Sequence, residues 1–234
     1  MSFAIGQALS RASDDPAVRE QLARYVEALL AANASLNLTS ARDPQAAAAH
    51  VSDSLGLAPY VTGPFVDVGS GGGFPAIPLV IVTGVRATLI ESVAKKARFL
   101  AEVVRELGLP VEVRAERAED AARDPALRES FAAATARAVG SAPTVIELTL
   151  PFLVVGGLAV LQRGKLEDAE RIAATDAALV LGGAIEAEVP VDDPEARERR
   201  LLLVRKIAPS GQRFPRRAGV PAKRPLCFEA GGDG

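Results

Sequence analysis

The segment Asp67-Val68-Gly69-Ser70-Gly71-Gly72-Gly73 combines an acidic residue with closely spaced glycines. Glycine permits positive φ angles and leaves no Cβ between the backbone and a ligand, so such a loop can approach a bound group closely. The spacing is Gly-x-Gly-x-Gly, not the Gly-x-Gly-x-x-Gly of dinucleotide-binding loops, and the absence of Gly-Lys-Ser/Thr excludes a P-loop. The negative charge of Asp67 would oppose a pyrophosphate but would favour a cationic amino-acid ligand.

A second acidic residue, Glu91, ends the apolar stretch 87–90, 22 residues after Gly69. A carboxylate at the end of a second strand can accept hydrogen bonds from two ribose hydroxyls. A ligand with a sulfonium, an ammonium and a ribose fits both features. The cofactor predicted from Asp67, Gly69, Gly71, Gly73 and Glu91 is therefore S-adenosyl-L-methionine.

The methyl acceptor is narrowed by the groups that the sequence lacks. No Pro-Cys motif is present for attack on a pyrimidine ring, and no Asn/Asp-Pro-Pro-aromatic clamp for an exocyclic amine. A ring nitrogen that carries an in-plane lone pair and no proton can be methylated by positioning alone, without a general base. The sequence is compatible with that reaction, and a carboxylate near the cationic product would assist it.

The only histidine, His50, lies at i, i+3 and i+4 spacing with Asp53 and Ser54 on one face of an expected helix. This polar face could border the pocket for the methyl acceptor, or it could be a helix surface whose side chains bond to one another. Asn37 could likewise border the pocket or end the preceding helix.

The order of secondary-structure elements predicts a parallel sheet covered by helices on both faces. Asp15-Pro16 and Asp43-Pro44 each supply an N-cap and a proline for the first turn of a helix. Apolar spacing and turn residues place helices near 16–33, 44–55, 93–107, 141–152 and 166–180, and Pro75 opens a further helix. They place strands near 65–69, 87–92, 111–114, 132–139, 156–164, 184–191 and 200–207.

The composition is that of a globular protein, with 234 residues, 49% of them hydrophobic and 24% charged. No uncharged apolar stretch reaches the roughly 18 residues of a membrane span, so no membrane partner is expected. No secretory leader is evident, and the single cysteine, Cys227, suits a reducing cytoplasm. One histidine and one cysteine predict no metal site.

The charge is distributed unevenly along the chain. Residues 205–225 carry seven basic and no acidic side chains, although the formal net charge is −2. Four prolines and two glycines in this segment predict an extended arm, and its charge favours a polyanionic partner. A solvated terminus without a partner would have the same composition.

The chain resembles the small-subunit rRNA methyltransferase G family, also called glucose-inhibited division protein B. The matching segments follow one another along almost the whole chain. They are NLTS (37–40), HVSDSL (50–55), FVDVGSGGGFPAIPL (65–79), LIESVAKKARFL (89–100), RAERAE (114–119), ARAVGS (136–141) and FPRRAGVPAKRPLC (214–227). Arg163 stands where the family often has lysine, and Ala49 stands where relatives tend to carry a basic residue.

The resemblance implies a class I, Rossmann-like α/β methyltransferase with a seven-stranded, mostly parallel sheet. It implies methylation of N7 of a guanine in the decoding-region loop of 16S rRNA, naked or in an assembling small subunit, by a cytoplasmic protein expected to be a monomer. The expected parts of this single structural domain are an N-terminal helical extension (1–62), a methyltransferase domain (63–207) and a basic C-terminal arm (208–234). A small-molecule methyltransferase, or an RNA-binding protein with a vestigial cofactor pocket, remains the alternative.

The resemblance also assigns roles to individual residues. Gly69 and Phe74 would contact the cofactor, Ala118 and Glu119 would flank its adenine, and Arg137 would line the site. The candidates bordering the acceptor pocket are Asn37, His50, Asp53, Ser54 and Arg163. The candidates for RNA contact in the arm are Arg213, Arg216, Arg217, Lys223 and Arg224.

Overall fold

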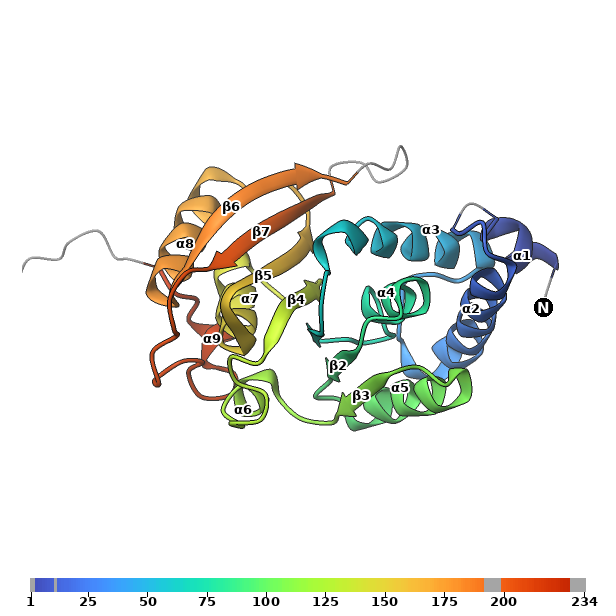
Figure 1. The fold of residues 1–234 in the computed structure, drawn as a ribbon, viewed down its shortest axis with the longest axis horizontal. Helices are drawn as coiled ribbons and strands as arrows, with labels where there is room; N and C mark the ends of the chain where they lie inside the picture. Colours follow the sequence, from blue (N-terminus) through green and yellow to red (C-terminus); the bar gives the residue numbers. More distant parts are fainter. Residues whose placement is uncertain (1–2, 11, 192–198, 228–234) are drawn as a thin grey trace, which may run out of the picture.

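The computed structural model describes residues 3–10, 12–191 and 199–227, and it is built around one seven-stranded sheet (Figure 1). The strand order is β3-β2-β1-β4-β5-β7-β6. The first five strands are parallel, whereas β7 runs antiparallel to both of its neighbours, β5 and β6. The strands are β1 (Phe65–Val68), β2 (Ala87–Ile90), β3 (Val111–Arg114), β4 (Phe131–Arg137), β5 (Leu153–Arg163), β6 (Gly183–Pro190) and β7 (Arg200–Lys206).

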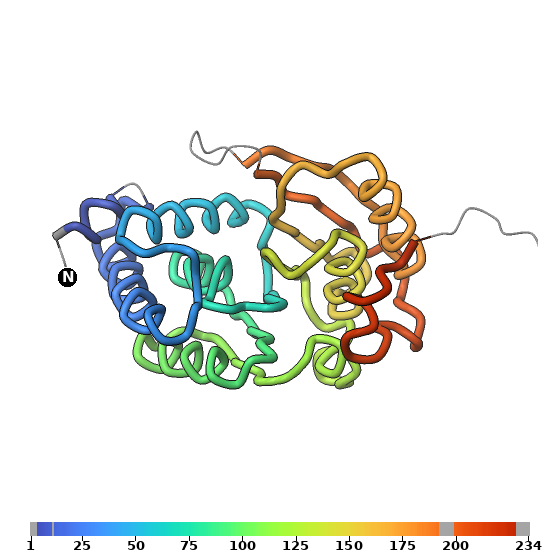
Figure 2. Tube along the Cα trace, turned by 180° about the vertical axis from the view of Figure 1, so that it is seen from behind, coloured from blue at the N-terminus to red at the C-terminus, as the bar shows by residue number. Residues whose placement is uncertain are grey.

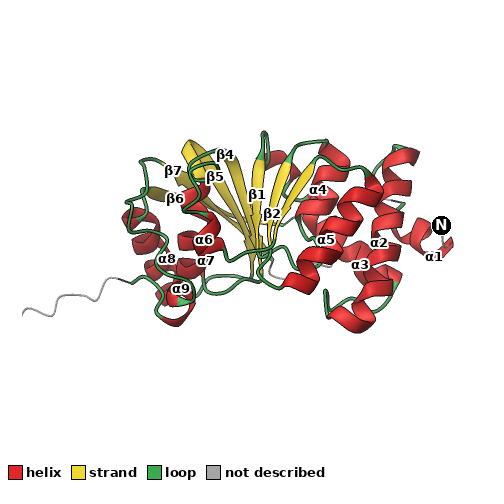
Figure 3. Ribbon diagram, turned by 90° about the horizontal axis from the view of Figure 1, so that it is seen from below, coloured by secondary structure: helices red, strands yellow, loops and turns green. Residues whose placement is uncertain are grey.

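Helices cover both faces of the sheet, which gives three layers and two separate hydrophobic cores (Figure 3). One face carries α1 (Phe3–Ala8), α2 (Pro16–Leu36), α3 (Pro44–Leu55), α4 (Ala76–Thr83) and α5 (Ala94–Leu107). The other carries α6 (Ala118–Ala121), α7 (Ala142–Thr149), α8 (Asp168–Val180) and α9 (Val220–Lys223). The 3-10 turns η1 (Ala58–Tyr60) and η2 (Leu150–Phe152) complete the fold. The expected mostly parallel α/β sheet is confirmed.

The long helices begin and end at the residues whose chemistry predicts it. The side chains of Asp15 and Asp43 accept backbone hydrogen bonds at the starts of α2 and α3, and a proline follows each of them. Gly108 ends α5 in the left-handed conformation, with φ +63°. The short helices α1, α6 and α9 were not predicted, because four to six residues are too few to establish a periodicity.

The N-terminal helices pack directly against the layer that supports the sheet. Leu22, Tyr25 and Leu29 of α2 belong to the same buried core as Ile77 of α4 and Leu100 of α5. The Tyr25 hydroxyl donates a hydrogen bond of 3.0 Å to the carbonyl of Gly72, which ties α2 to the glycine loop.

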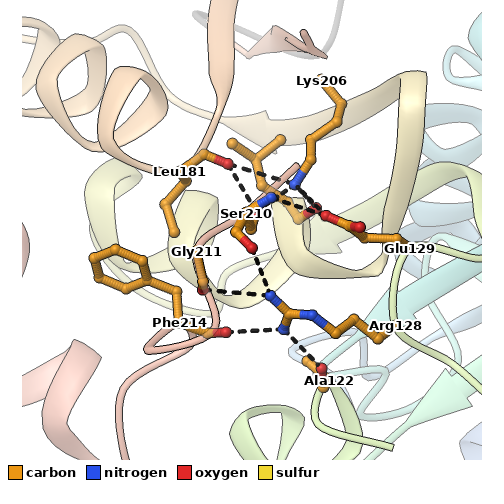
Figure 4. A network of polar contacts seen from close by, with 9 residues as sticks. Ala122, Arg128, Glu129, Leu181, Lys206, Ser210, Gly211 and Phe214 are labelled. Atoms are coloured by element: carbon orange, nitrogen blue, oxygen red, sulfur yellow. Dashed lines mark hydrogen bonds and ion pairs between the residues drawn. The ribbon is translucent and has the colours of Figure 1, made fainter. Parts of the chain in front are cut away.

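The basic C-terminal segment differs from its prediction as an extended arm. Residues 207–227 fold back against α6 and α7, at the end of the molecule opposite the N-terminal helices (Figure 2), and residues 228–234 lie outside the described part. The Arg128 guanidinium donates to the carbonyl groups of Phe214 and Ser210, at 2.8 and 2.9 Å (Figure 4). Buried Lys206 donates to the Ser210 hydroxyl and to the carbonyl of Leu150. Because Arg128 lies 86 residues before Phe214, composition alone could not reveal this packing.

Within the described ranges, no helix combines the length and the apolar character needed to cross a membrane.

Candidate functional site

The glycine loop, residues 69–73, connects β1 to α4 and passes through three positive φ angles. These are +73° at Gly69, +55° at Gly71 and +107° at Gly73. A Cβ on Gly73 would lie 2.7 Å from Cγ1 of Ile77, and one on Gly69 would lie 2.8 Å from Cγ2 of Val139. A Cβ on Gly71 would meet nothing closer than 3.8 Å. Gly69 and Gly73 are therefore required by packing, whereas Gly71 leaves room for a ligand.

The glycine loop forms one wall of a cavity of about 250 Å³, here called the loop cavity. The Arg137 guanidinium lies over the Phe74 ring, with its central carbon 5.0 Å from the ring centroid. The structure thus brings together Gly69, Gly71, Phe74 and Arg137, four of the predicted cofactor residues. The loop cavity is lined by Leu38, Thr39, Ser40, residues 69–72, Phe74, Arg137 and Ala138.

Glu91, at the end of β2, holds the glycine loop in place. Its carboxylate accepts hydrogen bonds from the Gly71 amide, at 2.8 Å, and from the Val93 amide, at 2.7 Å. Each carboxylate oxygen can accept more than one hydrogen bond, so both retain the capacity to bind a hydroxyl group of a ligand.

Asp67 lies inside the sheet beneath the loop and does not line the loop cavity. The Thr135 hydroxyl donates a hydrogen bond of 2.7 Å to Oδ1 of Asp67, and Oδ2 has no hydrogen-bond partner among the described residues. Burial raises the pKa of Asp67 to about 7. Any effect of this carboxyl on a ligand in the loop cavity is therefore electrostatic.

Ala118 and Glu119 lie at the start of α6, past the end of β3, and neither lines the loop cavity. The Glu119 carboxylate accepts hydrogen bonds from the Gly219 amide, at 2.7 Å, and from the Arg117 guanidinium, at 3.1 Å. Burial tends to raise the pKa of Glu119, but these hydrogen bonds outweigh it and lower that pKa. The C-terminal segment thus directly contacts a predicted cofactor residue.

A second cavity, of about 360 Å³, opens where β4 and β5 end, and we call it the strand-end cavity. It shares Arg137 and Ala138 with the loop cavity. Its polar lining comes from α3, from the last residues of β4 and β5, and from the residue before β7. These side chains are His50, Asp53, Arg137, Gln162, Arg163 and Arg199.

Asp53 is the buried anion of the strand-end cavity, with 1% of its side chain exposed. Its carboxylate lies 3.8 Å from Nδ1 of His50 and 3.9 Å from the Arg137 guanidinium, and it forms an ion pair with Arg199. Arg163 also lines the cavity, with its guanidinium 2.6 Å from a carboxylate oxygen of Glu170. Three arginines therefore line this cavity, and two of them, Arg137 and Arg199, pair with the buried Asp53 carboxylate.

His50 is neutral at pH 7, because burial and the charges of Arg137 and Arg199 lower its pKa to about 4. The other two candidates from the N-terminal part have structural contacts. The Ser54 hydroxyl donates to the carbonyl of His50 at 2.7 Å, and exposed Asn37 ends α2 with φ +50°. The structure brings His50, Asp53 and Arg163 together at the strand-end cavity, and Asn37 and Ser54 do not line it.

Sequence reasoning missed Asn33, Gln162 and Arg199. The Asn33 amide fixes the turn beside the loop cavity, donating to the carbonyls of Thr39 and Ala41 and accepting from the Leu38 amide. Its position on the apolar face of α2 was the available signal. Gln162 and Arg199 gave none, because only the folded chain brings them near Asp53.

The cations of the C-terminal segment fall into two groups. The guanidinium of Arg216 forms a bidentate ion pair with Glu147, which is fully buried, and Arg213 lies over the Phe214 ring. Arg217, Lys223 and Arg224 are exposed. Within the described residues, the side chains of these three exposed cations form no hydrogen bond to the rest of the protein. They remain available to bind a polyanion.

The two cavities can hold two ligands that meet at Arg137. The loop cavity has the glycine backbone and the Glu91 carboxylate nearby, and the strand-end cavity has buried groups of both charges.

Comparison with known proteins gives a family match over most of the chain. The family model described as "rRNA small subunit methyltransferase G" (GidB) matches residues 18–201. The "Ribosomal RNA small subunit methyltransferase G" of Chloroflexus aggregans is 43% identical over 213 residues, which are 88% of this chain and 89% of that protein. The protein of the same name from Roseiflexus castenholzii is 40% identical, over 88% of this chain and 91% of its own length.

Among solved structures, the geranyl diphosphate methyltransferase determined in complex with SAM is similar in fold. It superposes with a TM-score of 0.52 and 14% sequence identity, covering 67% of this chain and 85% of that chain. This similarity shows a shared methyltransferase fold.

Proposed function

The chain belongs to the rRNA small subunit methyltransferase G family, and from this premise we propose that it transfers a methyl group from S-adenosyl-L-methionine to N7 of a guanine in the decoding-region loop of 16S rRNA. The observation that carries the proposal is the pair of cavities that share Arg137, one beside a glycine loop and one with polar groups suited to a base.

The residues around the loop cavity fit the cofactor. The open side of Gly71 and the remaining acceptor capacity of Glu91 suit the ribose. Buried Asp67, in its ionised form above a pKa of about 7, places a negative potential behind the loop for a cationic ligand. Ala118 and Glu119 would flank the adenine, beyond the cavity. Gly69, Phe74 and Arg137 would contact the remainder of the ligand.

The protein contributes position and electrostatics to the transfer. When bound, S-adenosyl-L-methionine supplies a methyl group on a positively charged sulfur. The N7 lone pair forms the new N–C bond as the C–S bond breaks, so the positive charge passes to the purine and no proton moves. Neutral His50 places no positive charge beside the cationic methylated purine. The Asp53 carboxylate stabilises the positive charge of that product. Holding N7 in line with the methyl group supplies much of the acceleration.

We further propose that the enzyme acts as a monomer in the cytoplasm, on 16S rRNA that is naked or part of an assembling small subunit. Exposed Arg217, Lys223 and Arg224 lie on the folded C-terminal segment and are suited to contact phosphates.

The test uses 16S rRNA from cells that lack this enzyme, with labelled S-adenosyl-L-methionine. Borohydride and aniline then cleave the RNA at N7-methylated guanines. We expect one new cut in the decoding-region loop, from either naked RNA or small-subunit particles. Cofactor binding without label transfer to either form would contradict the proposal, as would label transfer without a cut.

Gly71→Asp separates an enzyme from an RNA-binding protein with a vestigial pocket. The new side chain occupies the open side of the loop, so methyl transfer should be abolished while RNA binding persists. Gly84→Asp is the matched control, because Gly84 has a similar φ of +68° and a Cβ added there would meet nothing within 4 Å. Biological activity that survives Gly71→Asp would favour the RNA-binding alternative.

A further inference from the structure

The strand-end cavity concentrates polar atoms that lack hydrogen bonds. In the described part of the chain, eight buried side-chain nitrogen and oxygen atoms have no hydrogen-bond partner, and six of them belong to residues that line this one cavity. Leaving such an atom unpaired costs roughly 1–3 kcal/mol, so native proteins contain few of them. Their concentration indicates a site whose partners arrive with a ligand. The six atoms are His50 Nδ1, both carboxylate oxygens of Asp53, Arg137 Nη1, Gln162 Oε1 and Arg163 Nε.

The arrangement of donors and acceptors defines the ligand. Asp53 offers two adjacent acceptors, and the unpaired Gln162 Oε1 is a further acceptor in the lining of the same cavity. Arg137 and Arg163 offer donors. A planar group with two adjacent N–H donors and a neighbouring carbonyl would pair with both Asp53 oxygens and with Arg137. The Watson–Crick edge of guanine has this pattern, with N1–H, N2–H and O6.

The other bases do not match. Adenine and cytosine each present a ring nitrogen lone pair beside the amino group, which would face a carboxylate oxygen and be repelled. Uracil presents one N–H between two carbonyls, so one of them would face the carboxylate. A cavity of about 360 Å³ falls in the size range of small-molecule sites, so one base turned out of an RNA strand can enter it.

We propose that Asp53 selects guanine, accepting hydrogen bonds from N1–H and N2–H of a base turned into the strand-end cavity while Arg137 donates to O6. This inference rests on the proposed function and assigns the residues that recognise its acceptor. O6 and N7 are neighbours on the purine, and Arg137 lines both cavities, so this orientation directs N7 toward the loop cavity. Arg199, whose side chain is 40% exposed, gives up its ion pair with Asp53 as the base enters.

The test replaces the target guanine with inosine, which lacks only the N2 amino group. The substrate is whichever form of the RNA the wild-type enzyme methylates, and the readout is kcat/KM for label transfer. Loss of one hydrogen bond to a charged group should lower the wild-type value for inosine about 10-fold or more. Asp53→Asn should lower methylation of guanine at least 10-fold, as an order-of-magnitude expectation, and should reduce the guanine-to-inosine ratio to about 1–3.

Two controls separate this effect from misfolding. Asp14→Asn removes an exposed carboxylate before α2 and should keep the wild-type ratio. The affinity of Asp53→Asn for S-adenosyl-L-methionine should equal that of the wild type. The wild-type measurement with inosine requires no variant, and a ratio near one there would overturn the assignment.

The outcomes also separate this inference from the proposed function. If the wild type transfers methyl to N7 and the guanine-to-inosine ratio is unchanged in Asp53→Asn, the role of Asp53 is overturned and the function stands. If the wild type transfers no methyl group to RNA, the function is overturned and the inference with it.

Discussion

Glu147 and Asp53 are both carboxylates with almost no solvent exposure, and both face arginine. Glu147 accepts four hydrogen bonds from Arg216, one from its backbone amide and three from its guanidinium. The Asp53 carboxylate forms ion pairs with Arg137 and Arg199 but has no hydrogen bond within the described residues. A buried ion pair is favourable only when hydrogen bonds complete it. Glu147 therefore holds the C-terminal segment, whereas Asp53 remains able to bind a ligand.

Breaking the saturated pair should have the largest effect. Arg216→Met leaves the Glu147 carboxylate buried with one backbone partner, and we expect the free energy of unfolding to fall by about 3–5 kcal/mol. Urea denaturation measures this change. Arg217→Met, at an exposed position, is the control and should stay within about 0.5 kcal/mol of wild type. Equal stability of the two variants would show that the pair does not anchor the segment.

Asp67 extends the comparison, because only one of its carboxyl oxygens has a partner. Burial raises the pKa of Asp67 from 3.8 to about 7, so the folded state binds this proton more tightly than the unfolded state. The contribution of Asp67 to the free energy of unfolding is therefore greatest below about pH 4, and it is lost as the pH rises to about 7. Relative to Asp67→Asn, the wild type should lose at most about 1.4 kcal/mol per pH unit across this window. Urea denaturation of both proteins from pH 4 to 8 checks this, and a constant difference would contradict it.

The Glu91 carboxylate accepts hydrogen bonds from two backbone amides and can still accept one from a ligand. Glu91→Ala removes the support of Gly71 and the predicted ribose acceptor together. We expect the affinity for S-adenosyl-L-methionine to fall by about 2 kcal/mol, roughly 30-fold in Kd. Calorimetric titration measures it, with exposed Glu102→Ala on α5 as the control. An unchanged Kd would refute the assignment of Glu91 to the cofactor site.

The same isosteric change at the two carboxylates sharpens the contrast. Glu147→Gln disrupts hydrogen bonds to a charged group and should cost about 1.5–3 kcal/mol of stability. Asp53→Asn breaks no hydrogen bond to its carboxylate, so we expect a change below about 1 kcal/mol. Denaturation of both variants in the same buffer compares them. A larger loss at Asp53 would mean that its ion pairs support the fold.

The sequence predicted those features whose causes are local. Asp15, Asp43 and Gly108 begin or end helices through residues next to them, and the glycine loop follows a strand. The segment containing Arg216 was expected to extend into solvent. Its composition is basic and rich in proline, but its conformation is determined by Glu147, 69 residues earlier.

In the functional site, too, the sequence predicted the residues that lie close together along the chain and not those that only the fold brings together. The glycine loop and Glu91 lie on consecutive strands, where the spacing of residues carries information. The strand-end cavity joins α3 to the ends of β4 and β5, and Gln162 lies 109 residues from Asp53. No spacing pattern extends over such a distance, so the neighbours of Asp53 became evident only in the folded chain.

The smallest expected effect concerns the cations that the fold leaves unpaired. Of the seven basic residues in 205–225, Arg205 pairs with Glu186, Lys206 is buried and Arg216 pairs with Glu147. Replacing exposed Arg217, Lys223 and Arg224 with glutamine should make the plot of log K for RNA against log salt shallower by about 2, if all three contact phosphates.

Filter binding across a salt series measures that slope, and Arg86→Gln is the control. Arg86 lies just before β2, at the amino ends of the parallel strands, whereas the two cavities lie at their carboxyl ends. Its replacement should therefore leave the slope unchanged. An equal slope for the triple variant and the wild type would mean that the folded segment does not contact RNA. Only the paired cations of the segment would then have a role, in the fold, as Arg216 does through Glu147. A slope reduced by about 2 would instead divide the segment into a paired cation that fixes its position and exposed cations that bind the substrate.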